Sequence, residues 1–282
     1  NFDQNLWDFN QILIFRIGNP GKNAFGATLV ILLRQTLTLQ TSRLTNKTVV
    51  ANFRDNDILN GGQGAPLTPL YHQLILSKIK INYPSVMINI GGISNITYLE
   101  KKNKIISFDT GPGNYLIDQW VKSNSKMEFD DMGSLAKSGK LNNDILEKFL
   151  SNDYYRAKNP KSLDVKDFNL NDLRGMSLED GCATLSMLTV KSICNSINNL
   201  REIPNIILFS GGGRKNQFII DNIKKILNKQ IHLIDEFNFN GDFTESQAFA
   251  YLAIRSYLKK YISLPETTGV KNPCLGGKIY RN

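Results

Sequence analysis

Residues 86–114, VMINIGGISNITYLEKKNKIISFDTGPGN, constrain the fold of this chain more than any other stretch. Two short runs of β-forming residues, 87–90 and 96–99, flank the pair Gly91-Gly92, which is typical of a β-hairpin turn. A third such run, 105–108, ends at Asp109. The sequence therefore predicts three consecutive strands, followed by a glycine-bearing loop that opens a helix.

This stretch also carries candidate chemistry. A Gly-Gly turn exposes backbone N–H groups without side chains in the way, so it can cradle a phosphate. Asp109 is predicted at the carboxyl end of a strand, where open α/β sheets bind their ligands. Together these features suggest phosphoryl transfer. The alternative is two ordinary glycine turns and a turn-forming aspartate, and the spacing alone slightly favours this alternative.

Strand and helix patterns alternate along the rest of the chain, which predicts an α/β fold with a mixed sheet, because the hairpin is antiparallel. A buried strand at 205–209 runs into Gly211, Gly212 and Gly213 and then a helix at 217–227, a turn suited to anions. Further strands are predicted at 48–51 and 231–234, and helices after Pro69, after Asn114, at 143–150, from Ser177 and from Asp242 to Leu258. The tail is predicted to be loop-rich.

Composition excludes few functions. The 282 residues are 41% hydrophobic and carry a formal charge of +9. A basic chain suggests nucleic acid, but the lysines are spread out and no aromatic-interleaved basic patch occurs, so no nucleic-acid partner is expected. The sequence contains no apolar run of eighteen residues or more, so no membrane-spanning helix is predicted. Cys182, Cys194 and Cys274 form no C-x-x-C pair, which favours unpaired thiols and a cytoplasmic location.

The sequence does not decide the structure of some segments. Residues 1–46 are the least legible: a strand is suggested at 12–15, and the apolar run 27–40 fits a buried helix or a strand. The sequence GNPGK at 18–22 fails the Walker pattern, so it is interpreted as a turn. The irregular loop 152–168 fits a lid and a plain surface excursion equally well.

Two further candidates come from outside the central stretch. Arg54 is a fork-shaped donor beside a glycine loop, suited to gripping ligand oxygens; the alternative is a local ion pair with Asp55 or Asp57. Glu245 opens the last long helix, where the alternative is the third position of a capping box that begins at Asp242.

Seven motifs occur in the order found in the anhydro-N-acetylmuramic acid kinase family, which the chain resembles over about residues 46–282. They are NFRDNDILNGGQGAPLTPLYH (52–72), NIGGISNIT (89–97), FDTGPGN (108–114), DDMGSLAKSGK (130–140), PKS (160–162), SGGGRKN (210–216) and the Glu245 helix. The resemblance implies an actin-like ATPase (ribonuclease H-like) fold, in which two α/β domains clamp ATP. It also implies ATP- and Mg²⁺-dependent opening and 6-phosphorylation of 1,6-anhydro-N-acetylmuramic acid in cell-wall recycling, by a cytoplasmic homodimer that uses no membrane partner.

The resemblance also implies roles for individual residues. Asp109 matches the catalytic base that activates water, and Glu245 a second catalytic position facing that carboxylate. Arg54 matches a position that faces the sugar. The sugar-holding loop corresponds to Thr110, Gly111, Pro112, Gly113 and Asn114. The ATP-binding residues correspond to a phosphate hairpin of Gly91, Gly92, Ser94 and Asn95 and an adenosine-side turn of Gly211, Gly212 and Gly213.

The chain departs from the family pattern at its start. Family members are longer and begin with a phosphate loop of the type GTSxDG, which is absent here, and the chain begins without Met. Asn52 stands where Asp is usual, and Cys182 where Gln is common. We therefore expect a partial first ATPase-like domain at 1–70, with 1–46 matching poorly, and a complete second domain with a C-terminal tail at 71–282. The alternative function is an inactive truncated remnant that binds sugar or nucleotide weakly.

Overall fold

The computed structural model describes residues 12–17, 27–32, 42–44, 46–102, 104–157, 159–164, 168–204 and 206–281. The chain divides into two compact units, and each is described by itself: unit 1 combines residues 1–71 with 245–282, and unit 2 is 72–244. The C-terminal segment groups with unit 1, because its strand pairs with β3 (Thr48–Ala51) and its helix packs on N-terminal residues.

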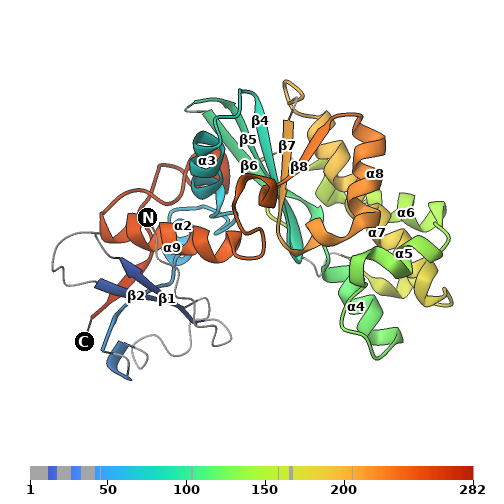
Figure 1. Ribbon diagram of the computed structural model, residues 1–282, viewed down its shortest axis with the longest axis horizontal. Helices are drawn as coiled ribbons and strands as arrows, with labels where there is room; N and C mark the ends of the chain where they lie inside the picture. Colours follow the sequence, from blue (N-terminus) through green and yellow to red (C-terminus); the bar gives the residue numbers. More distant parts are fainter. Residues whose placement is uncertain are drawn as a thin grey trace. The chain divides into compact units, whose positions relative to one another are not determined.

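Unit 2 is built on a five-stranded mixed sheet in the order β6-β5-β4-β7-β8 (Figure 1). Strands β4, β5 and β6 form an antiparallel meander, whereas β7 is parallel to β4 and β8 is parallel to β7. This is the ribonuclease H-like arrangement, and it confirms the hairpin and the mixed sheet predicted from the sequence. The strands are β4 (Ser85–Ile90), β5 (Ile93–Lys101), β6 (Lys104–Pro112), β7 (Ile206–Ser210) and β8 (Gln230–Leu233).

The helices of unit 2 lie between β6 and β7 and between β7 and β8 along the chain. The long helix α7 begins where the sequence predicts, because the Ser177 hydroxyl accepts a hydrogen bond from the Asp180 N–H at 3.1 Å. The helices are α4 (Tyr115–Asn124), α5 (Ser134–Ser138), α6 (Asn143–Leu150), α7 (Leu178–Asn198) and α8 (Gln217–Leu227). Short 3-10 turns occur at Asp131–Gly133, Asp153–Arg156, Leu170–Leu173, Gly212–Lys215 and Ile234–Phe237.

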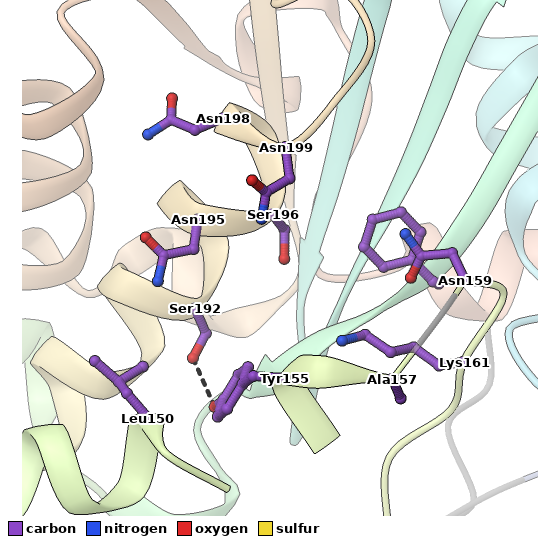
Figure 2. Close-up of a pocket in the computed structure, with 11 residues that line it drawn as sticks. Leu150, Tyr155, Ala157, Asn159, Lys161, Ser192, Asn195, Ser196, Asn198 and Asn199 are labelled. Carbon is purple, nitrogen blue, oxygen red and sulfur yellow. Dashed lines mark hydrogen bonds between the residues drawn. The ribbon is translucent and has the colours of Figure 1, made fainter. Parts of the chain in front are cut away.

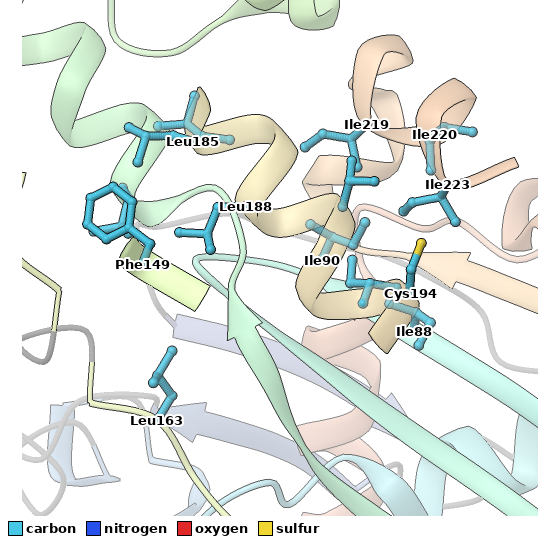
Figure 3. Packing of buried hydrophobic residues seen from close by; sticks show 14 of the residues in the cluster. Ile88, Ile90, Phe149, Leu163, Leu185, Leu188, Cys194, Ile219, Ile220 and Ile223 are labelled. Atoms are coloured by element: carbon cyan, nitrogen blue, oxygen red, sulfur yellow. The ribbon is translucent and has the colours of Figure 1, made fainter. Parts of the chain in front are cut away.

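The core of unit 2 lies between the sheet and α7. Ile88 and Ile90 of β4 share one cluster with Leu188 and Cys194 of α7 and with the isoleucines of α8, as Figure 3 shows. All six residues of β4 are buried, four of them apolar and two, Ser85 and Asn89, polar. A fully buried Leu or Ile stabilises a fold by about 1.5–3 kcal/mol, so this cluster fixes the position of β4 and of the turns at its end.

Unit 1 contains a four-stranded sheet in the order β1-β2-β3-β9, with β9 antiparallel to β3. The tail was predicted to be loop-rich, which is wrong for β9. The core of unit 1 combines Val50, Phe53 and Leu67 with residues of α9. The strands are β1 (Ile12–Ile17), β2 (Ala27–Leu32), β3 (Thr48–Ala51) and β9 (Lys278–Tyr280), and the helices are α2 (Asp55–Leu59), α9 (Thr244–Tyr257) and α10 (Pro265–Thr268), with α3 (Pro69–Lys78) at the boundary between the units. Strand β2 decides the open assignment at 27–32, whereas 33–40 and the GNPGK segment lie outside the described residues.

Candidate functional site

Two of the predicted glycine loops are hydrogen-bonded to each other at the end of β4. The Gly113 N–H donates to the Gly92 carbonyl at 2.9 Å, and the Asn114 N–H donates to the Gly91 carbonyl at 2.8 Å. A Cβ on Gly113 would lie 2.3 Å from the Gly91 oxygen, so only glycine permits this approach. The structure therefore brings the predicted phosphate hairpin and the predicted sugar loop together.

The third glycine turn packs on the same strand end. Gly211 has φ +80°, and a Cβ there would lie 2.5 Å from the Ile90 oxygen; a Cβ on Gly213 would lie 2.2 Å from Ile90 Cγ2. Gly212, in contrast, is exposed, and an added Cβ would meet nothing within 4 Å. Gly211 and Gly213 thus let the turn pack closely against Ile90 at the end of β4, while the backbone of Gly212 faces solvent.

One row across the sheet links the candidate base to both turns. Asp109 pairs with Asn95, Asn95 with Asn89, and Asn89 with Ser210, the residue before Gly211. Three strand spacings separate the ends of this row, which is roughly 14 Å. Asp109 therefore lies beside the 91–95 hairpin and on the same row as the strand that enters the 211–213 turn.

The sequence predicted that Asp109 ends its strand. This is wrong, because β6 continues to Pro112. The continuation includes a β-bulge: Asn95 pairs with Asp109 but Ser94 pairs with Gly111, which leaves Thr110 as the extra residue. The Thr110 hydroxyl donates to the Ser94 carbonyl at 3.1 Å. Bulges of this kind re-aim side chains and are frequent beside active sites.

The Asp109 side chain is 5% exposed and is held by residues that sequence reasoning missed. The Leu163 N–H donates to Oδ2 at 2.9 Å, the Asp109 N–H donates to the Lys161 carbonyl at 2.9 Å, and the Tyr154 hydroxyl donates to the Asp109 carbonyl. A backbone N–H on a carboxylate oxygen stabilises its ionised form. The one sequence signal for these contacts is the PKS motif at 160–162.

The hairpin contains buried polar atoms that lack partners among the described residues. They are Oγ of Ser94, whose side chain is fully buried, and Oδ1 of Asn95. A buried polar group without a hydrogen bond costs about 1–3 kcal/mol, so such groups are usually satisfied by water or a ligand. The Ser94 hydroxyl can donate or accept, whereas Asn95 Oδ1 can only accept, so the two atoms need different partners.

A buried arginine holds the third turn in place. Arg214 donates to the Gly211 carbonyl at 3.0 Å and forms ion pairs with Asp235 at 2.6 Å and Asp242 at 2.7 Å. The hydrogen bond from its guanidinium lowers the pKa of Asp235 to about 2. The turn is therefore fixed by charge-assisted hydrogen bonds as well as by glycine packing.

Arg54 and Glu245 belong to unit 1 and are described apart from Asp109; both side chains are exposed. Arg54 precedes α2 and forms no ion pair with another residue in the described part of the chain, so the alternative of a pair with Asp55 or Asp57 is not observed. The capping-box alternative for Glu245 is not observed among the described residues either: the Asp242 N–H donates to Asn240 Oδ1, and the Asp242 carboxylate binds Arg214 and Lys215.

A polar pocket of about 320 Å³ lies beside β6 in unit 2. Its wall includes Tyr155, Lys161 and the polar face of the last turns of α7, where Tyr155 hydrogen-bonds Ser192 (Figure 2). None of the predicted site residues lines it, but Phe108 and Lys161 connect it to the surroundings of Asp109.

Within the described residues, no three His, Cys, Asp or Glu side chains gather as a metal site, and no helix has the length and apolarity to cross a bilayer. The three cysteines are unpaired, as expected, and burial raises the pKa of Cys182 and of Cys194 to about 12.

Comparison with known proteins identifies relatives over most of the chain. The family model for anhydro-N-acetylmuramic acid kinase matches residues 27–282, a range that begins earlier than the motifs indicated. Anhydro-N-acetylmuramic acid kinases from Pelagibacter ubique and Zymomonas mobilis are 46% and 39% identical, over 86% and 85% of this chain and 67% and 65% of their own length. The chain thus spans about two thirds of the length of these relatives.

Similarity to solved structures is weaker. Component A of (R)-2-hydroxyglutaryl-CoA dehydratase from Acidaminococcus fermentans covers 86% of this chain and 95% of its own, with 14% identity and a TM-score of 0.46. That likeness is too low to support an argument. The family match and the two kinase relatives are sufficient on their own: this chain belongs to the anhydro-N-acetylmuramic acid kinase family.

Proposed function

We propose that this protein acts in the ATP-dependent hydrolytic opening and 6-phosphorylation of 1,6-anhydro-N-acetylmuramic acid, a step of cell-wall recycling. Membership of the kinase family supports the reaction class. The observation that carries the proposal is the row from Asp109 through Asn95 and Asn89 to Ser210, which connects a candidate base to two glycine turns.

Asp109 supplies the general base in this proposal. Its carboxylate takes a proton from water, the water oxygen bonds to the anomeric carbon, and the bond between that carbon and O6 breaks. O6 would then accept the γ-phosphoryl group as its bond to ADP breaks, so the products are N-acetylmuramic acid 6-phosphate and ADP. Thr110 to Asn114 follow Asp109 directly and would hold the sugar.

The glycine turns are suited to bind the nucleotide. Mg²⁺-bound ATP supplies the transferable phosphoryl group. The 91–95 hairpin offers the exposed backbone of Gly92 for phosphate oxygens, and Gly212 leaves open space at the adenosine-side turn. Positioning and charge neutralisation of this kind provide most of the catalysis in phosphoryl transfer.

The experiment is phosphorylation of 1,6-anhydro-N-acetylmuramic acid by this chain with ATP and Mg²⁺, followed by mass spectrometry. We expect N-acetylmuramic acid 6-phosphate from the unmodified chain and a loss of roughly 10²–10⁴-fold in Asp109→Asn, the range for removal of a general base. Absence of product at high enzyme concentration contradicts activity of this chain.

Calorimetry with the sugar and with Mg-ATP measures binding separately from turnover, so heat of binding without product would contradict the proposed reaction but not ligand binding. We also propose a cytoplasmic homodimer, which analytical ultracentrifugation tests, and we expect no nucleic-acid retardation at low salt.

A further inference from the structure

Three residues of one loop contact Asp109, and we call Tyr154, Lys161 and Leu163 the Asp109 clamp. The Leu163 N–H donates to the carboxylate Oδ2, and the backbone carbonyl of Lys161 accepts from the Asp109 N–H. The Tyr154 hydroxyl donates to the Asp109 carbonyl. The clamp therefore binds both main-chain polar groups of Asp109 and one oxygen of its side chain.

The clamp is held together by its own contacts. The Lys161 ammonium lies 4.3 Å from the centre of the Tyr154 ring and donates to the Tyr154 carbonyl at 2.9 Å. Tyr154 is buried, and its ring packs edge-on against Tyr155 at 5.5 Å between centroids. The Tyr154 hydroxyl thus has little freedom to leave the Asp109 carbonyl, since the ring is fixed from two sides.

We propose that the Asp109 clamp consists of positioning residues, which fix the orientation of the Asp109 carboxylate for the reaction. The proposal rests on the function proposed above. The Leu163 N–H restricts rotation of the carboxylate, while Lys161 and Tyr154 fix the backbone on either side of its Cα. Displacement of a catalytic group by about 1 Å is enough to cost a hundredfold in rate, so restraints on the main chain matter as much as those on the side chain.

Two adjacent tyrosines make it possible to distinguish a positioning role of this loop from a packing role. Tyr154 and Tyr155 have the same ring, lie in the same loop and pack on each other, but the Tyr155 hydroxyl bonds Ser192 of α7 in place of Asp109 (Figure 2). Removing one hydroxyl oxygen from either residue leaves the ring in place. If the loop acts only by packing, Tyr154→Phe and Tyr155→Phe will have the same effect.

The kinetic test compares these two variants with the unmodified protein. We expect Tyr154→Phe to lower kcat roughly tenfold to a hundredfold with the KM for ATP unchanged, because misplacement of the base affects the chemical step. Tyr155→Phe should lower kcat by no more than about threefold, less than 1 kcal/mol by the rate relation. Equal losses in the two variants, or full kcat in Tyr154→Phe, overturn the proposal.

A second measurement does not require turnover. The amide proton of Leu163, observed by NMR, reports its bond to Asp109; we expect it to move upfield in Asp109→Asn and to shift in Tyr154→Phe but not in Tyr155→Phe. The proposal is overturned if the chemical shift of the Leu163 amide proton is unchanged in Asp109→Asn while the circular dichroism of that variant matches the unmodified chain. If the unmodified chain transfers no phosphate, the proposed function fails, and the NMR measurement alone decides the clamp.

Discussion

Gly212 and Gly213 are neighbours in one turn, but the structure surrounds them differently. A Cβ on Gly213 would lie 2.2 Å from Ile90 Cγ2, whereas a Cβ on Gly212 would meet nothing within 4 Å. We predict that Gly213→Ala lowers the free energy of unfolding by about 1–3 kcal/mol, the usual cost of overpacking. Gly212→Ala should change it by less than about 0.5 kcal/mol, as for open surface positions.

Urea unfolding at neutral pH measures both variants. Calorimetry with Mg-ATP then tests the assignment of the turn: Gly212→Ala should remain folded but bind nucleotide more weakly, because its methyl group would occupy the approach to the backbone. Unchanged nucleotide affinity in a folded Gly212→Ala would contradict the proposed role of this turn.

Individual residues were predictable from sequence where the chemistry is local. The glycine turns at Gly91 and Gly211 and the strand-borne carboxylate of Asp109 were recognisable from local sequence, and their assignment to a ligand site stays a prediction. Tyr154 and Leu163 were not predicted, because they reach Asp109 across about fifty residues of chain and use a hydroxyl and a backbone N–H that no spacing rule identifies.

Helix α3 gives a prediction at the scale of elements, through its contact with β5. His72 of α3 is fully buried, with Nδ1 2.7 Å from Thr97 Oγ1, and burial lowers its pKa to about 3. In the unfolded chain the pKa is about 6.5. Between these values the unfolded state binds a proton that the folded state excludes, so stability is complete above pH 6.5 and falls as the pH drops toward 3.

We therefore predict that the free energy of unfolding falls by about 2 kcal/mol between pH 7 and pH 5 through His72 alone. The variant His72→Gln keeps a polar group for Thr97 but does not titrate, so it should lose less over the same interval. Urea unfolding at both pH values, at constant ionic strength, measures the difference. Parallel pH dependence in the two proteins would exclude His72 as its source.

Elements were predictable to the extent that their signals are local. The cap at Ser177 and the apolar periodicity of 217–227 define α7 and α8 without reference to the rest of the fold. Strand β9 has only three residues and forms because β3 offers a pairing edge, which the sequence near residue 278 does not reveal. Likewise, the bulge at Thr110 depends on the register of β5, so the extension of β6 past Asp109 was missed.

At the scale of the whole molecule, the two units have separate cores. Unit 2 buries a cluster that includes Leu188, whereas unit 1 closes its own cluster when the C-terminal segment returns and places Leu252 against Phe53 and Leu67. The sequence indicated the family. It did not indicate this return, because the pattern around α9 fits a helix in either domain.

Separate cores predict separable stability. Leu252 and Leu188 are both fully buried, and replacement of a buried Leu by Ala costs about 2–5 kcal/mol. Because the lost contacts are local to one unit, we predict that Leu252→Ala accelerates hydrogen exchange in β3, β9 and α9 but leaves β4 to β8 protected. Leu188→Ala should do the reverse.

Hydrogen exchange with mass spectrometry resolves these segments in the intact chain, so neither unit has to be isolated. The two variants control for each other, since the substitution and the burial are the same and only the unit differs. A uniform loss of protection in both variants would show that the units unfold as one cooperative body, because the free energy lost in one core would then be shared by the other.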